Sequence, residues 1–393
     1  MPQLNFEDTK TAFAYKSDAQ LKSAKNILML WQKPWLVNIG NKIVLFGLKL
    51  HFPMQFLTPD SAFEQFVGGE SLKSCESTIN TLAEHKVGAI LDYSVEALKS
   101  ESGFNASARE IMETIDQGAD NDAIPFSVFK ITGLGRIRVL TEVSRKTKLS
   151  QKQKNAYRRI RFRVRAICEY ASLKGVRILI DAEESWFQNV IDKLAMDMMA
   201  AHNKTIPIVY NTYQLYRHDV LNLLKTHHEE AKEKGFILAA KLVRGAYMEK
   251  ERERAEEEGY PSPIQATKED TDRDYDSALK YCAENIDSIA VMVGTHNEHS
   301  TKLFAELMEE YDIPHDHPHV HFAQLWGMSD NLTFNLARHG YKVAKYVPYG
   351  PFKKVLPYLM RRASENTSIA GQMSRELTLI SNELTRRKTE EPA

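Results

Sequence analysis

YVPYGPFKKVLPYLMRRASEN, residues Tyr346–Asn366, decides the fold, because this stretch contains one complete unit of strand, turn and helix. It begins as the end of a strand, passes a Pro/Gly turn and continues as a helix of about three to four turns. At about 100° per residue, the apolar side chains of this helix fall within one arc of about 140°. The separate polar arc carries Tyr358, Arg361, Arg362 and Glu365.

The polar face of this helix has two interpretations. A pair of adjacent arginines is commonly no more than the solvated face of a surface helix. Here, however, a tyrosine precedes the pair Arg361–Arg362 by one turn, a glutamate follows it by one turn, and Tyr346 stands in the preceding strand. A planar guanidinium holds a carboxylate through two parallel hydrogen bonds. The pattern therefore favours a site for a small carboxylate anion.

The same unit recurs upstream, where apolar runs of strand type alternate with helical patterns. Two of the intervening helices are predicted at Gln151–Lys174 and Trp186–Ala201. A third is predicted near Ala106–Gln117, because Ser107 and Glu110 have the spacing of a capping box. The predicted strands are 87–94, 127–133, 176–184, 206–214, 236–247, 289–297, 320–327 and 342–350.

Continuous apolar strands separated by helices indicate a parallel sheet that helices cover. Eight such units within about 280 residues predict an α/β fold of the (β/α)8 TIM-barrel type. An open, doubly wound sheet is the alternative, but no G-x-G-x-x-G motif follows the first strand and no Walker loop occurs. We therefore expect an N-terminal helical segment (residues 1–85), the barrel (86–370) and a C-terminal helix or tail (371–393).

Composition and charge argue against several classes of protein. The 52 Lys and Arg residues balance the 52 Asp and Glu residues, so we expect no nucleic-acid partner. Lysines, a proline and asparagines interrupt the apolar run 27–50, which predicts a packed helix rather than a membrane span. Three cysteines without metal-ligand spacing fit a reducing cytosol. The oligomeric state is left open.

Two further patterns have ordinary interpretations. The run 249–258 has opposite charges at i,i+4 spacing, which predicts a solvated helix face. Four histidines between His315 and His321 alternate at two residues, but a proline intervenes, so we expect no metal site.

Polar residues stand toward the ends of the predicted strands, where barrel enzymes carry their chemistry. Any one of them could be a capping or solvated residue. Their recurrence on strand after strand instead predicts a site, and the lack of a Ser or Cys nucleophile elbow argues against acyl transfer. The residues are Asp92, Lys130, Asp181, Asn211 with Gln214, the segment 241–247, the segment 295–297, Gln324 and Tyr346.

Four motifs together resemble the FAD-dependent proline dehydrogenases. They are KLVRGAY (Lys241–Tyr247), THN (Thr295–Asn297), IDAEE (Ile180–Glu184) and YLMRRASEN (Tyr358–Asn366), and the similarity covers about Val87–Asn366. The resemblance implies a distorted (β/α)8 barrel whose last helix lies over the barrel mouth.

The resemblance also implies roles for individual residues at the substrate. Arg361 and Arg362 match the pair that holds the proline carboxylate, and Asp181 and Lys241 match catalytic positions. Glu96 matches a glutamate that pairs with Arg361 as a gate. The remaining substrate positions are Lys130 beneath the substrate, Tyr346 and Tyr358 around the pyrrolidine ring, and Leu325 on the apolar wall.

A second set of positions matches contacts to FAD. Lys241 lies where relatives approach the flavin N5 region, and Asn211 with Gln214 matches the flavin ring edge. The other matched positions are Val243, Arg244, Gly245, Ala246, Lys268, Thr295, His296, Gln324 and Glu365.

The implied reaction is the oxidation of L-proline to Δ1-pyrroline-5-carboxylate by a monofunctional enzyme that passes electrons to a quinone. That acceptor implies a cytoplasmic protein in peripheral contact with the inner face of a membrane. Another flavin-dependent barrel oxidoreductase, such as hydroxyproline dehydrogenase or methylenetetrahydrofolate reductase, is the nearest alternative. A binding module without activity is the alternative from another class.

Overall fold

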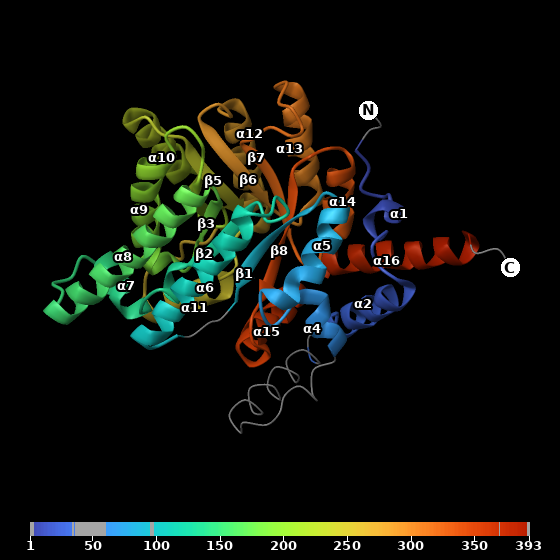
Figure 1. Ribbon diagram of the computed structural model, residues 1–393, viewed down its shortest axis with the longest axis horizontal. Helices are drawn as coiled ribbons and strands as arrows, with labels where there is room; N and C mark the ends of the chain where they lie inside the picture. Colours follow the sequence, from blue (N-terminus) through green and yellow to red (C-terminus); the bar gives the residue numbers. More distant parts are fainter. Residues whose placement is uncertain (1–3, 34, 36–59, 95–97, 369, 391–393) are drawn as a thin grey trace. The chain divides into compact units, whose positions relative to one another are not determined.

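The computed structural model describes residues 4–33, 35, 60–94, 98–368 and 370–390 (Figure 1). Its strands close into a barrel in chain order, which confirms the predicted (β/α)8 architecture. The strands are β1 (Gly88–Tyr93), β2 (Phe126–Lys130), β3 (Arg177–Asp181), β4 (Val209–Gln214), β5 (Leu238–Val243), β6 (Ile289–Gly294), β7 (Val320–Leu325) and β8 (Val343–Tyr349).

The helices alternate with these strands, as Figure 1 shows for the segment from β2 to β7. Before the barrel come α1 (Thr9–Ala12), α2 (Asp18–Trp31), α4 (Asp60–Phe66) and α5 (Glu76–Glu84). The others are α6 (Glu101–Ala119), α7 (Ile137–Ser144), α8 (Gln151–Lys174), α9 (Ser185–His202), α10 (Val220–Lys234), α11 (Met248–Glu258), α12 (Lys268–Glu284), α13 (Glu298–Glu310), α14 (Asp330–Arg338), α15 (Phe352–Ser368) and α16 (Ala370–Glu390).

Local signals set the ends of α8 and misled the prediction for α6. The ends of α8 agree with the prediction: Ser150 and Gln153 form a capping box, and Gly175 ends the helix with φ 69°. The predicted capping box of Ser107 was wrong. α6 begins earlier, because the Ser100 hydroxyl accepts a hydrogen bond from the backbone N–H of Gly103, and Ser107 is buried inside the helix.

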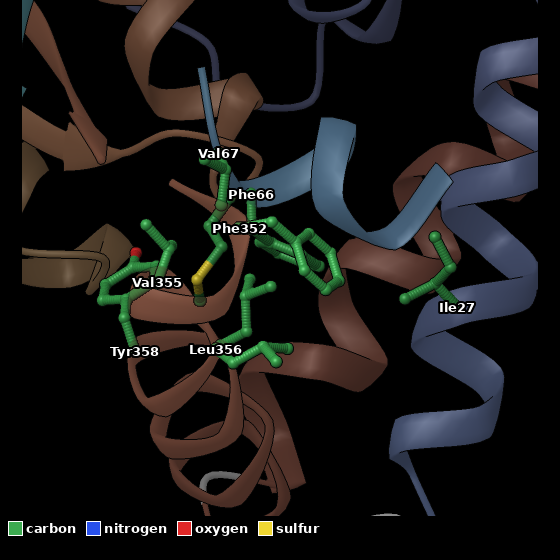
Figure 2. Close-up of a cluster of buried hydrophobic side chains, with 9 residues drawn as sticks. Ile27, Phe66, Val67, Phe352, Val355, Leu356 and Tyr358 are labelled. Atoms are coloured by element: carbon green, nitrogen blue, oxygen red, sulfur yellow. The ribbon is translucent and has the colours of Figure 1, made fainter. Parts of the chain in front are cut away.

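The chain forms two compact parts. The first comprises residues 1–96, 296–298 and 324–393, and the second comprises residues 97–295 and 299–323. In the first part, Ile27, Phe66, Val355, Leu356 and Tyr358 belong to one apolar cluster, drawn from α2, α4 and α15 (Figure 2). α16 lies against α2, where Leu28 packs with buried leucine and isoleucine side chains of α16. In the second part, the strands from β2 to β6 and the first four residues of β7 consist largely of buried aliphatic and aromatic residues.

Two searches of the described residues bear on membrane and metal sites. None of the helices in these ranges combines the length and the hydropathy needed to cross a bilayer. No cluster of three His, Cys, Asp or Glu side chains there is arranged to hold a metal ion. Of the apolar run 27–50, residues 27–31 belong to α2, where Ile27 and Leu28 are buried, and residues 36–50 lie outside the described ranges.

Candidate active site

Three charged side chains meet toward the carboxyl ends of β2, β3 and β5. Lys241 Nζ lies 2.5 Å from one oxygen of Asp181, and Lys130 Nζ lies 3.3 Å from the other. The side chains of Asp181 and Lys241 are 11% and 8% exposed, and that of Lys130 is 23% exposed. Burial makes an unpaired charge costly, and the two ammonium groups supply the opposite charge beside the Asp181 carboxylate.

The strand register explains why these three groups meet. Lys130 pairs with Asp181 across β2 and β3, and Thr212 pairs with Lys241 across β4 and β5. Paired residues of parallel strands point to the same face of a sheet, and neighbours along a strand alternate. Because Ile180 pairs with Asn211, Asp181 shares its face with Thr212 and Lys241. The sequence-predicted trio therefore occupies one face of the sheet.

Asn211 points to the opposite face. Its amide nitrogen donates to Asp192 on α9 at 2.9 Å, and Gln188 of the same helix donates to the same oxygen at 2.8 Å. A contact between Asn211 and a ligand on the Asp181 face would require the side chain to leave this buried network. Gln214 lies on the Asp181 face, so it is the better placed of the two residues predicted at the flavin ring edge.

Glu183 connects the ends of three elements, and sequence reasoning assigned it no role. Its carboxylate accepts hydrogen bonds from the N–H of Thr132, at 3.0 Å, and from the Thr132 hydroxyl. Its N–H donates to Gln188, and its carbonyl accepts from the amide of Gln214, both at 2.7 Å. Burial raises the pKa of Glu183 to about 7, although the bonds from Thr132 oppose that shift. The two carboxylates of the motif IDAEE that follow Asp181 were the signal that could have identified it.

The guanidinium of Arg244, a predicted cofactor residue, contacts four side chains. Its guanidinium donates to Asp272 at 2.6 Å, Thr295 at 2.9 Å and Ser300 at 3.0 Å, and lies 4.4 Å from the centre of the Tyr275 ring. The geometry thus brings together Arg244 and Thr295, two predicted contacts from different strands.

Asp272 also links Arg244 to a third predicted residue. Lys268, exposed at the start of α12, lies 2.5 Å from this carboxylate. Two cationic side chains at one carboxylate are a suitable donor set for a phosphate-bearing ligand.

The backbone around Arg244 is hydrogen-bonded to the residues that directly follow β4. The N–H groups of Leu215 and Tyr216 donate to the carbonyls of Val243 and Arg244, at 2.9 and 2.7 Å. Gly245 has φ 142°, and a Cβ there would lie 2.5 Å from the Tyr216 ring. Only glycine fits this position, because both the backbone angle and the close approach exclude a side chain. Ala246, the next predicted contact, is exposed.

The charged helix α11 is not simply a solvated face, so that prediction was wrong at Glu251. This carboxylate is completely buried and accepts the N–H and the hydroxyl of Ser185, at 2.6 and 2.5 Å. Ser185 is the first residue of α9, so Glu251 caps a helix 66 residues away in sequence. Nearby, Lys250 pairs with Glu184, and Arg254 stacks 4.5 Å from the Trp186 ring. Sequence periodicity carries no signal for such a partner.

In the first compact part, the two arginines of α15 lie beside an aromatic ring, and the carboxylate site stays a prediction. The guanidinium carbons of Arg361 and Arg362 are 5.9 and 5.6 Å from the centre of the Tyr358 ring. Tyr358 itself is 4% exposed and packs in the apolar cluster beside Val355 (Figure 2). Tyr358 therefore lies beside both arginines, as the helical pattern predicts, and its ring is also buried against the apolar cluster. Leu325, the predicted apolar wall, packs against the same cluster.

His296 is neutral and fixed in one tautomer. The N–H of Leu325 donates to its Nε2 at 3.4 Å, so the ring proton lies on Nδ1, which donates to the Ser329 hydroxyl at 2.9 Å. Burial, together with the positive charges of Lys345 and Arg362, lowers the pKa of His296 to about 3. The charge of the predicted clamp on α15 therefore acts on the His296 ring.

The remaining predicted residues have separate environments. Tyr346 is buried in β8, where its carbonyl accepts the N–H of Trp326 at 2.9 Å. The side-chain oxygen of Gln324 accepts the hydroxyl of Thr333 on α14 at 2.8 Å. Glu96 and the side chain of Glu365 lie outside the described residues, so the gate and the Glu365 contact stay predictions.

Comparison with known proteins identifies the family. Residues 75–375 match the family model for proline dehydrogenase. Proline dehydrogenase 1, mitochondrial, from Dictyostelium discoideum is 34% identical over 97% of this chain and 74% of its own length. Hydroxyproline dehydrogenase from Xenopus laevis is 29% identical over 98% of this chain and 90% of its own length.

A solved structure is similar in fold. Proline utilization A from Bdellovibrio bacteriovorus, inactivated by N-propargylglycine, has a TM-score of 0.70 at 22% identity over 78% of this chain. This chain spans 32% of that protein. The resemblance of the four sequence motifs, the barrel and these relatives agree, and the chain belongs to the proline dehydrogenase family of oxidoreductases.

Proposed function

We propose that this chain oxidises L-proline to Δ1-pyrroline-5-carboxylate with FAD as its cofactor. The single observation that carries the proposal is the buried carboxylate of Asp181 held between Lys130 and Lys241. These are three residues that the family resemblance assigns to the reaction. The relatives named proline dehydrogenase support the same substrate.

The proposed substrate contacts follow from the chemistry of proline. Arg361 and Arg362 bind the carboxylate, and Tyr346 with Tyr358 encloses the pyrrolidine ring. These contacts orient C5–H, and the exclusion of water protects the hydride path. The reaction removes a hydride from C5 and a proton from nitrogen, which leaves a C5=N double bond.

The chain's own residues fit a dinucleotide cofactor. Arg244 and Lys268 supply two cations at Asp272, and Thr295 supplies a hydroxyl beside them. The missing side chain of Gly245 allows a close approach of the backbone. When bound, FAD supplies the two-electron acceptor. Gln214 is proposed for the flavin ring edge, because its amide is already oriented by the carbonyl of Glu183.

Hydroxyproline oxidation is the second candidate, because the Xenopus laevis relative is named hydroxyproline dehydrogenase. Tyr346 favours proline. Its bulky ring, if it encloses the substrate as proposed, leaves little room for a 4-hydroxyl group.

Anaerobic bleaching of the flavin tests the proposal directly. Purified protein should be yellow, and L-proline should reduce its flavin absorbance, while 4-hydroxyproline and methylenetetrahydrofolate should act much more slowly. Acid precipitation should release all the flavin, since the motifs contain no His or Cys suited to a covalent link. Colourless protein that stays colourless after incubation with FAD, or bleaching only by 4-hydroxyproline, would contradict the assignment.

The electron acceptor is proposed to be a membrane quinone, reached from the inner face of the membrane by a cytoplasmic protein in peripheral contact. A soluble quinone analogue should then sustain turnover, and NAD⁺ should not, because the chain lacks a dinucleotide fingerprint for NAD. Steady-state rates with the two acceptors decide this point.

A further inference from the structure

A buried group of charged side chains lies beside the predicted substrate residues and has no role in the reaction described above. It contains Lys345 on β8, Asp330 at the start of α14, Lys16 before α2, and Glu376 on α16. All four are at least nine-tenths buried: Lys345 is 0% exposed, Asp330 1%, Lys16 8% and Glu376 8%. Burying so many charges is costly, so their arrangement calls for a physical reason.

The ammonium group of Lys345 has three partners. Lys345 Nζ forms an ion pair with Asp330 Oδ1 at 2.8 Å and donates hydrogen bonds to the carbonyl of Leu325 at 3.4 Å and to the carbonyl of Met328. Leu325 ends β7, Met328 lies in the loop that joins β7 to α14, and Asp330 begins α14. Lys345 therefore ties this loop to β8, one residue away from the predicted substrate residue Tyr346.

The same loop carries groups already placed at the site. Leu325, the last residue before the loop, donates its N–H to His296. Ser329 is the last residue of the loop. Its hydroxyl is hydrogen-bonded to His296, and its N–H donates to the Glu376 carboxylate at 3.1 Å. Ser329 has φ 52°, a left-handed conformation that is unfavourable for any residue other than glycine. Its contacts to His296 and Glu376 hold the backbone in this conformation.

Asp330 is held in turn by the N-terminal segment. Its Oδ2 accepts the Tyr15 hydroxyl at 2.8 Å and pairs with Lys16 at 3.0 Å. Burial alone would raise the pKa of Asp330, but Lys16 and Lys345 lower it well below its ordinary value. Tyr15, Lys16 and Glu376 all lie outside residues 75–375, the part of the chain that the family model matches.

We propose that Lys345 and Lys16 are positioning residues for proline oxidation. Through Asp330 they hold the loop from Leu325 to Ser329, and with it His296, in the arrangement that the substrate wall requires. The N-terminal segment thereby supports predicted substrate residues that belong to the same compact part of the chain. This inference rests on the proposed function.

Steady-state kinetics of Lys16 variants test the inference. Lys16→Met removes the charge, loosens Asp330 and should raise the KM for L-proline about tenfold, while kcat per bound flavin changes less than about threefold. Lys16→Arg keeps the charge and should restore KM to near the wild-type value. Tyr15→Phe removes one hydrogen bond to Asp330 and should raise KM about threefold. A purely structural role would lower the amount of active enzyme and leave KM unchanged.

The matched control is Lys22→Met, because Lys22 is an exposed lysine of the nearby helix α2. Its KM should equal that of the wild type. An unchanged KM in both Lys16→Met and Tyr15→Phe overturns the inference, and so does an equal rise in Lys22→Met. If Lys16→Met fails to fold, Tyr15→Phe and Lys16→Arg decide between the outcomes. Wild-type enzyme that neither bleaches nor turns over with proline would instead refute the proposed function.

Discussion

Replacing Lys241 by methionine should cost about 2–3 kcal/mol of transition-state stabilisation. The side chain of Lys241 is 8% exposed, and its ammonium lies 2.5 Å from Asp181. A buried hydrogen bond between charged groups contributes about 1.5–3 kcal/mol, and removing one partner of a buried pair costs about 3–5 kcal/mol. Lys130 remains 3.3 Å from Asp181 and keeps one compensating charge, so the lower range applies.

That free energy corresponds to a loss of about 30- to 150-fold in kcat/KM. The assay is steady-state oxidation of L-proline with a soluble quinone analogue, normalised to bound flavin. Lys193→Met is the matched control, because Lys193 forms an exposed i,i+4 pair with Asp197 at 3.1 Å and its side chain is 70% exposed. It should change kcat/KM less than about twofold. If Lys241→Met retains full flavin content and its kcat/KM equals that of this control, the role proposed for Lys130, Asp181 and Lys241 is wrong.

Three further predictions follow from particular contacts. Arg361→Met should raise the KM for proline steeply, by about 30-fold or more, while FAD stays bound. An unchanged KM would refute the proposal that Arg361 binds the proline carboxylate. Glu251→Gln should lower the melting temperature by several degrees, because it weakens the cap of α9. Glu258→Gln changes an exposed carboxylate of the same helix and should leave the melting temperature unchanged; equal effects would refute the capping role of Glu251. Glu183 has its pKa raised to about 7, so its stabilising effect is full below about pH 4.5 and is lost as the pH rises through 7; Glu183→Gln should therefore flatten the fall in melting temperature between pH 5 and 8, and an unchanged slope would contradict it.

The fold could be predicted because its signals are local. Each strand is a short apolar run, and the helix Gln151–Lys174 was predicted to the residue; in the structure, Ser150 and Gly175 cap its two ends. The same kind of signal failed at α6, since a Ser-x-x-Glu spacing also occurs inside helices and the true cap is Ser100. Strand β3 ends at Asp181, earlier than predicted, because the following residues turn to contact Gln188 and Glu251.

Part of the candidate site could be predicted for the same reason. Lys130, Asp181 and Lys241 stand near strand ends, and equivalent ends of parallel strands meet at one edge of a sheet. Which side of the strand a residue faces was harder to predict. Asn211 is three residues from Gln214, yet its amide points to Asp192 on α9 rather than to the Asp181 face.

By itself, the sequence determined the alternation of strands and helices, the barrel class and the polar residues at the strand ends, because all of these depend on neighbours along the chain. Only the tertiary structure decided the partners of the buried charges. Glu251 meets Ser185 across 66 residues, and Asp330 meets Tyr15 across 315. Such pairs leave no periodic pattern, since burial rather than chain position makes each charge require a partner.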